Sequence, residues 1–287
     1  AARAGDGGAV DVAERSAVAT DVDIPAAPFY GQRAVENISL DEIFGFVNES
    51  ALFKGQWQIR QGPRSVDEFA ELIDGQIRPI FERLKAECIE RSLLEPRVVY
   101  GYFPCQSEGN ELIVYHDDER TERARFRFPR QSRGKRMCIA DFFAPRGSGR
   151  VDVLPVQLVT MGAVATEHSQ KLFAADEYSE YLYFHGLSVE TAEALAEYWH
   201  AKIRAELGIA GDDARDVKRL FAQGYRGSRY SFGYPACPNL EDQEILFTLI
   251  DPSSIDVSLS DEYQLDPEQS TSAVIAHHPE ARYFVID

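Results

Sequence analysis

The chain has 287 residues, and its 30 basic and 47 acidic side chains give a net charge of −17, which excludes a general nucleic-acid-binding protein. Hydrophobic residues make up 44% of the chain, enough for a buried core. No apolar run reaches the roughly 20 residues that a membrane helix needs, and no secretory signal is visible. The four cysteines show neither Cys-x-x-Cys nor Cys-x-x-His spacing, which predicts no zinc site and fits a reducing cytoplasm.

The N-terminal segment and a first helical region come next in chain order. Residues 1–28 are rich in Ala, Gly, Asp and Val without periodicity, so we expect residues 1–35 to be a linker or an ordered N-terminal tail. Residues 66–94 carry apolar residues at spacings of three and four, which predicts a helix. Pro79 indicates either a kink in that helix or a wrong assignment.

Several short β-type runs follow the helical region. They are Val98–Phe103, Glu111–Tyr115, Ala124–Phe128, Ile139–Phe143 and Val151–Val159. Successive strands between helical stretches are typical of an α+β fold with a mainly antiparallel, twisted sheet and flanking helices.

The clearest predicted helix covers residues 188–207, with Ser188 as a suitable N-cap. Its apolar residues form one stripe, and at about 100° per residue Glu193 falls at the edge of that stripe while Glu197 points further outward. A carboxylate at the rim of a buried face can reach a bound amino group or hydroxyl. The alternative is a boundary glutamate that only meets solvent.

The stretch 229–239, Arg-Tyr-Ser-Phe-Gly-Tyr-Pro-Ala-Cys-Pro-Asn, is the most informative for function. Its glycine and two prolines predict a stiff, irregular loop with some backbone groups free to face a ligand. Arg229 offers a planar fork for a carboxylate, and Tyr234 offers a flat amphipathic ring. The loop would suit a small zwitterion that carries a base or a methyl sulfonium; a purely structural turn is the other interpretation. Cys237 has no nearby His or acid in the sequence to activate it, so we expect a small packed residue.

Basic residues gather between Arg120 and Arg136, where eight Lys or Arg residues stand in an otherwise acidic chain. Arg123, Arg125 and Arg127 alternate with apolar residues, so one strand face should be basic. Such a strand is either a charged edge that discourages aggregation or a docking site for an acidic flavodoxin-like protein.

Beyond its composition, the loop at 229–239 resembles the signature loop of the reactivation domain of cobalamin-dependent methionine synthase. The resemblance runs from about residue 36 to the end of the chain. Further motifs occur in the same order as in that family: Asn48-Glu49-Ser50-Ala51-Leu52-Phe53, Gly101-Tyr102-Phe103-Pro104, Cys138–Pro145, Ala192–Tyr198, Gln223–Gly227 and His278-Pro279.

The resemblance implies a single C-shaped domain over residues 36–287 that binds S-adenosyl-L-methionine (AdoMet). Arg229 would pair with the ligand carboxylate, and Glu193 and Asn48 would bind its polar groups. The backbone around Ser231 would contact adenine, and Tyr234 would line the site. The resemblance implies neither a catalytic residue nor a metal ligand on this chain.

Two positions depart from the family pattern. Asn48 stands where many members carry an acid, and Ile275 replaces an expected tyrosine, so that it could contribute only packing. His277 and His278 are adjacent and would point to opposite faces of a strand, so we expect loop histidines and not a metal pair.

The implied function is the reactivation of a methyltransferase: one electron and the AdoMet methyl group convert inactive cob(II)alamin to methylcobalamin. Cobalamin and homocysteine would be bound by other modules, so the isolated chain should not turn over homocysteine. Expected partners are the corrinoid-binding module and a flavodoxin-like or diflavin reductase. Two alternatives stay open: a docking module with a weakened AdoMet site, and a free-standing enzyme that uses Cys237 or the histidines.

Overall fold

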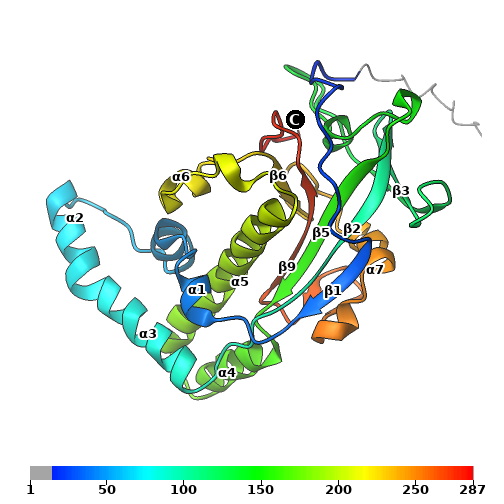
Figure 1. Cartoon of the computed structure of the whole chain (residues 1–287). Helices are drawn as coiled ribbons and strands as arrows, with labels where there is room; N and C mark the ends of the chain where they lie inside the picture. The colour runs from blue at the N-terminus through cyan, green and yellow to red at the C-terminus, as the bar shows by residue number, and fades with distance from the viewer. Residues whose placement is uncertain (1–14, 287) are drawn as a thin grey trace, which may run out of the picture.

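The computed structural model describes residues 15–286; residues 1–14 of the predicted tail and Asp287 lie outside the described part. A seven-stranded sheet runs through the molecule (Figure 1) in the order β4-β3-β2-β5-β9-β6, and β1 also pairs with β2. Every pairing is antiparallel. The strands are β1 (Gly31–Val35), β2 (Arg97–Glu108), β3 (Glu111–Tyr115), β4 (Glu122–Arg127), β5 (Asp152–Thr160), β6 (Ser228–Ser231) and β9 (Ser270–Ala276).

Helices cover both faces of the sheet, and the sheet divides the core into two clusters of buried side chains. The longest helix, α5 (Tyr178–Glu206), lies along β5 and β9, whereas α7 (Asp242–Leu249) packs near β4. The other helices are α1 (Leu40–Phe44), α2 (Val66–Leu72), α3 (Arg78–Glu90), α4 (Ala163–Ala174) and α6 (Val217–Phe221), with π-helical turns η1 (Ala51–Gln56) and η2 (Ile73–Ile77). Shorter elements are the 3₁₀ turns η3 (Ile139–Phe142), η4 (Arg146–Ser148), η5 (Ala210–Asp212) and η6 (Pro252–Ile255), and a ribbon of β7 (Ser258–Leu259) and β8 (Leu265–Asp266).

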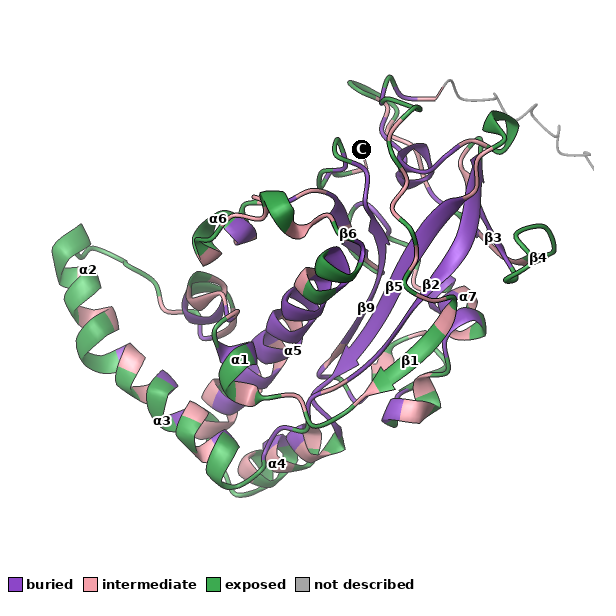
Figure 2. Cartoon of the chain, in the orientation of Figure 1, coloured by how far each residue is buried: buried purple, intermediate pink, exposed green. Residues whose placement is uncertain are grey.

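This architecture confirms the predicted α+β class. In Figure 1, α2 and α3 lie on the far side of α1 and α5 from the sheet, and α4 lies at the lower end of α5, which gives an open, C-like outline. All nine residues of β5 are buried, because the strand is covered on both faces. Figure 2 shows the same for α5, which is buried over most of its length, whereas α2 is largely exposed.

Three sequence predictions need correction or refinement. Residues 139–143 were expected as a strand but form the turn η3, because tertiary hydrogen bonds to Asp141 hold the backbone away from the sheet. The long helix begins at Tyr178 and not at Ser188, whose hydroxyl donates to the His185 carbonyl in mid-helix. The region 66–94 is α2, η2 and α3 in succession; Pro79 lies in the first turn of α3, where its missing N–H costs least.

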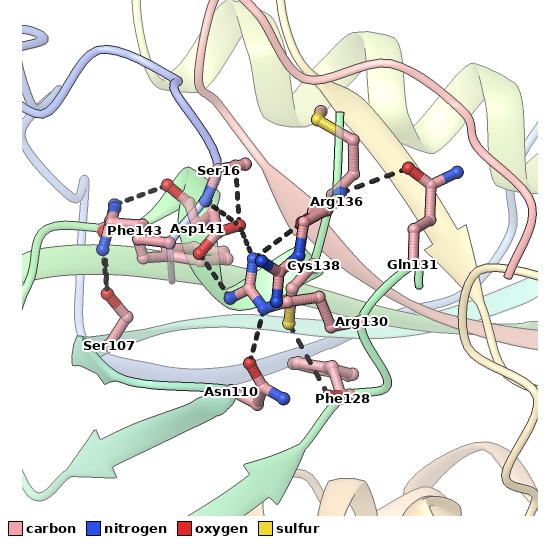
Figure 3. Close-up of polar contacts among 12 residues, drawn as sticks. Ser16, Ser107, Asn110, Phe128, Arg130, Gln131, Arg136, Cys138, Asp141 and Phe143 are labelled. Carbon is pink, nitrogen blue, oxygen red and sulfur yellow. Dashed lines mark hydrogen bonds and ion pairs between the residues drawn. The ribbon is translucent and has the colours of Figure 1, made fainter. Parts of the chain in front are cut away.

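The described part of the tail is tied to the domain by a buried ionic hub, drawn in Figure 3. Arg130 donates to both oxygens of Asp141, at 2.5 and 2.8 Å, and the two side chains are 4% and 0% exposed. Ser16 adds its backbone N–H and its hydroxyl to Asp141 Oδ2, at 3.2 and 2.6 Å. Arg15 donates to the carbonyls of Asp141 and Phe143. Further along, β1 joins the sheet beside β2, where a Cβ at Gly101 would meet the Gly31 carbonyl oxygen at 2.2 Å.

Candidate functional site

The loop at 229–239 is held at the end of the sheet by strand β6. Arg229 lies opposite Ile275 of β9, and Gly227 precedes the strand with φ +92°, where an added Cβ would lie 2.4 Å from the Ala276 carbonyl oxygen. Glycine is therefore required for the chain to enter β6 this close to β9. Ile275 is buried in the core, so its predicted packing role is confirmed.

The part of the loop after β6 is irregular, as predicted, but residues 229–231, which were expected in the same irregular loop, belong to strand β6 and pair with β9. The Gly233 N–H donates to the Cys237 carbonyl at 2.8 Å, and the Cys237 N–H donates to the Tyr234 carbonyl at 2.9 Å. The Phe232 and Tyr234 N–H groups also donate within the protein, to the Ser272 and Ser231 carbonyls at 3.4 Å. The expectation that these backbone groups are free to face a ligand is therefore wrong for these two N–H groups. Cys237 is buried, which confirms it as a packed residue, and burial raises the pKa of its thiol.

Four of the five predicted site residues come together where this loop meets α5. Both terminal nitrogens of Arg229 lie 3.3 Å from Glu193 Oε2. The Tyr234 hydroxyl lies 3.4 Å from Glu193 Oε1, and the Ser231 hydroxyl lies 3.5 Å from Arg229 Nη1. The Glu193 charge, with burial second, raises the pKa of Tyr234 to about 12. Tyr234 is still 47% exposed, so a charged and aromatic surface faces solvent here.

Asn48, the fifth predicted residue, lies beside this group but is engaged locally. Its Oδ1 accepts the backbone N–H groups of Ser50 and Ala51, at 3.1 and 3.2 Å, just before η1. Asn48 also lines a cavity of about 950 Å³ between the η1 segment, α2 and α6. It is linked to the Arg229 group through Glu190, whose carboxyl interacts with the Asn48 backbone N–H and with the charge of Glu193.

A buried polar network behind Arg229 escaped the sequence analysis. Glu197 was expected to point outward but is buried, at 3.9 Å from Arg229 Nη2 and 3.9 Å from Arg204 Nη1. Arg204 is 1% exposed, pairs with Asp213 Oδ2 at 2.8 Å and lies 3.9 Å from the centre of the Tyr225 ring. The sequence signal for this network was the spacing of its charged residues along one helix: Glu190, Glu193, Glu197 and Arg204. Reading the helix as a single apolar stripe missed this signal, because α5 is buried on several sides.

Burial dominates the electrostatics of this network. It raises the pKa of Glu197, an effect that the charges of Arg229 and Arg204 partly offset. It also lowers the pKa of His200 well below its usual value, together with the nearby charges of Arg204 and Arg229, so the imidazole is neutral. Both His200 nitrogens and Glu197 Oε1 are buried without a hydrogen-bond partner.

The predicted basic surface is smaller than the sequence suggested. Arg125 pairs with Glu111 and Glu122, and Arg130 is buried against Asp141. Arg123 donates to the Thr248 and Leu249 carbonyls. Four basic residues of this stretch are exposed, and we call them the basic edge: Arg120, Arg127, Arg133 and Lys135.

The histidines near the C-terminus follow β9 in an irregular segment, as predicted, and both are buried. His277 Nε2 lies 2.6 Å from Asp152 Oδ1, and His278 Nε2 lies 2.9 Å from the Ala19 carbonyl oxygen. Over residues 15–286, no three His, Cys, Asp or Glu side chains are grouped so that they could hold a metal ion. The same residues include no helix long and apolar enough to cross a membrane.

Known proteins share this sequence and this fold. The family described as "Vitamin B12 dependent methionine synthase, activation domain" matches residues 43–287. Methionine synthase of Mycobacterium tuberculosis (strain ATCC 25618 / H37Rv) is 45% identical over 296 aligned residues, and that of Mycobacterium leprae (strain TN) is 43% identical. Each alignment covers 96% of this chain and 24% of the relative, so the chain spans about a quarter of their length.

A solved structure supports the same fold assignment. The crystal structure of the MetH reactivation domain bound to AdoHcy superposes with a TM-score of 0.84 at 24% identity, over 93% of this chain and 84% of that one. The family match covers most of the chain, including β6, its loop and α5. The chain therefore belongs to the family of vitamin B12-dependent methionine synthase activation domains.

Proposed function

We propose that this chain binds AdoMet at the group formed by Arg229, Glu193, Ser231 and Tyr234, with Asn48 at its edge. The observation that carries the proposal is the Arg229 fork, held by one Glu193 oxygen at 3.3 Å while the other lies 3.4 Å from the Tyr234 hydroxyl. The structural neighbour with AdoHcy bound supports the same ligand class, because AdoHcy is AdoMet without its methyl group.

The chemistry of the side chains fits the ligand. A guanidinium fork can bind a carboxylate through two parallel hydrogen bonds, which a lysine cannot do. Glu193 and the neighbouring acids suit an ammonium and a sulfonium, and the exposed ring of Tyr234 suits a flat base or the methyl group. Asn48 would contribute its side-chain amide, since its oxygen already accepts two backbone N–H groups.

In the larger enzyme, the bound AdoMet would reactivate cobalamin. One electron from a reducing partner and the AdoMet methyl group would convert cob(II)alamin to methylcobalamin and leave AdoHcy. The chain's own residues would bind AdoMet and orient its methyl group, which removes most of the orientational cost of the transfer. Transfer of a methyl group to homocysteine would belong to other modules, in keeping with the share of the relatives that this chain covers.

Titration calorimetry with AdoMet tests the proposal. We expect one-to-one binding that Arg229→Ala abolishes and that Arg229→Lys weakens by roughly 10- to 100-fold, since lysine keeps the charge but loses the fork. Arg219→Ala, at an exposed arginine of α6, is the matched control and should bind as the parent does. Thermal melts of each variant separate lost binding from lost folding. Absence of binding by the parent chain at millimolar AdoMet would refute the proposal and favour the docking-module alternative.

We further propose that the basic edge binds the reducing partner, an acidic flavodoxin-like or diflavin protein. Arg120 and Arg127 are exposed, whereas Arg125 is already paired with acids. The double reversal Arg120→Glu/Arg127→Glu should slow association, and the parent's association rate should fall steeply with salt. Arg64→Glu, at an exposed arginine in another part of the chain, is the control. Unchanged association kinetics after the double reversal would refute this assignment.

A further inference from the structure

Three glutamates of α5 lie along the proposed AdoMet site at spacings of three and four residues. Glu190, Glu193 and Glu197 therefore share one side of the helix. Glu193 is the most exposed of the three, whereas Glu190 and Glu197 are 7% and 8% exposed. Two of these three carboxyl groups are thus in the interior, where an unpaired charge is costly.

The cations nearby are too few for these acids. Arg204 is engaged by Asp213 at 2.8 Å and is 3.9 Å from Glu197, which leaves Arg229 as the cation shared by Glu193 and Glu197. Over residues 15–286, Glu190 has no ion pair with Lys, Arg or His. Glu193, Glu197 and Asp213 thus share two guanidinium groups, and Glu190 pairs with neither. Glu197 Oε1 and both terminal nitrogens of Arg204 are buried without a hydrogen-bond partner, so the polar atoms behind Arg229 are not fully satisfied within the chain.

We propose that Glu190 is a specificity-determining residue that favours the sulfonium ligand AdoMet over the thioether AdoHcy. This inference rests on the proposed AdoMet-binding function. The two ligands share the amino acid, ribose and adenine groups, so Arg229 and Ser231 cannot separate them by those contacts. They differ by one methyl group and by one positive charge, and a carboxylate without a cationic partner responds directly to that charge.

The same arrangement couples ligand binding to a proton. Burial, and then the charge of Glu193, raise the pKa of Glu190 to about 7, while the Asn48 backbone N–H acts in the opposite direction. The Tyr234 hydroxyl, from the loop after β6, is a further titratable group that interacts with the Glu190 charge. A cationic ligand favours the ionised form, so AdoMet should release a proton from Glu190, and AdoHcy should release less. The product AdoHcy would then dissociate more readily than the substrate AdoMet.

Calorimetric titrations of the parent chain and of Glu190→Gln with AdoMet and with AdoHcy test the inference. We expect Glu190→Gln to lower AdoMet affinity by about tenfold, a factor equal to about 1.4 kcal/mol, and to change AdoHcy affinity by less than about twofold. Glu180→Gln is the matched control: it lies on the same helix, ten residues or about 15 Å away, in an exposed pair with Arg83. It should leave both affinities unchanged.

Proton release gives a second readout that needs no stable variant. Titration of the parent chain near pH 7 in two buffers of different ionisation enthalpy should show more protons released with AdoMet than with AdoHcy. Equal proton counts for the two ligands, or an unchanged AdoMet-to-AdoHcy affinity ratio in a folded Glu190→Gln variant, would overturn the inference while leaving the AdoMet site in place. Failure of the parent chain to bind AdoMet at all would instead overturn the proposed function, and this inference with it.

Discussion

Removal of the Asp141 charge should destabilise the chain more than removal of any exposed acid. Asp141 is fully buried and receives two hydrogen bonds from Arg130 and two from Ser16. Asp141→Asn leaves the Arg130 guanidinium buried without its counter-charge, and breaking such a pair costs about 3–5 kcal/mol. At about 2 °C per kcal/mol for a domain of this size, Tm should fall by about 6–10 °C. Equilibrium urea denaturation measures the free energy of unfolding directly.

Two further variants separate the ion pair from a general loss of polar contacts. Glu180→Gln breaks a pair with Arg83 in which the side chains are 40% and 41% exposed, and it should cost less than about 1 kcal/mol. The double variant Arg130→Met/Asp141→Leu should recover part of the stability lost in Asp141→Asn, since the Arg130 charge is no longer buried without its partner, while Ser16 still loses its acceptor. If Asp141→Asn costs no more than Glu180→Gln, the burial argument for this hub is wrong.

Three other predictions follow from single residues. Gly227→Ala should lower the free energy of unfolding by roughly 1–3 kcal/mol, because φ is +92° and the added Cβ would meet the Ala276 carbonyl. Gly147→Ala, with open space around its Cβ, is the control. Equal losses for the two variants in urea denaturation would contradict the steric argument. Cys237 should react with thiol reagents at pH 8 only as fast as the chain unfolds, since burial raises the pKa of its thiol; rapid labelling of the native chain, measured by mass spectrometry, would show an accessible thiol. Because the pKa of Glu190 is raised to about 7 in the native chain, the parent should lose stability relative to Glu190→Gln as pH rises from about 4.5 to 7. The difference between their free energies of unfolding should grow by about 3 kcal/mol over this range. A pH-independent difference would refute the prediction.

Local patterns predicted the centre of the sheet, β2, β3, β4 and β5, but missed β1, β6 and β9. Glu111–Tyr115 was predicted with the bounds it has, and the predicted segments at 98–103, 124–128 and 151–159 fall on β2, β4 and β5. The loop after β6 was also readable, since Gly233 and Pro235 restrict the backbone whatever surrounds them. Residues 139–143 failed because their β-type composition reflects burial and not pairing: Asp141 in their middle is bound by Arg130 and Ser16, from distant parts of the chain.

The residues of the candidate site could be named through the family resemblance, whereas the buried network behind them could not. Arg229, Glu193, Ser231 and Tyr234 were named from the sequence, and the structure brings them together. Glu197 was misplaced because a single apolar stripe assumes that a helix is covered on one side only. The helix α5 is covered by the sheet on one side and by α1 and η1 elsewhere, so its polar residues are buried as well. That two-sided burial is a tertiary property that helical periodicity does not contain.

The buried acids of α5 also show why stability and the proposed ligand recognition would oppose each other at this site. A hydrophobic or amide side chain at position 190 would avoid the cost of an unpaired carboxyl group, and the predicted gain in stability of Glu190→Gln measures that cost. The same variant should lose the preference for a cationic ligand, because the charge that destabilises the free chain is the charge that the sulfonium would neutralise. Gain of stability together with loss of AdoMet selectivity in one variant would be the expected sign of a residue retained for recognition and not for folding. If Glu190→Gln gained stability and kept full selectivity, discrimination would have to come from Glu193 and Glu197 alone.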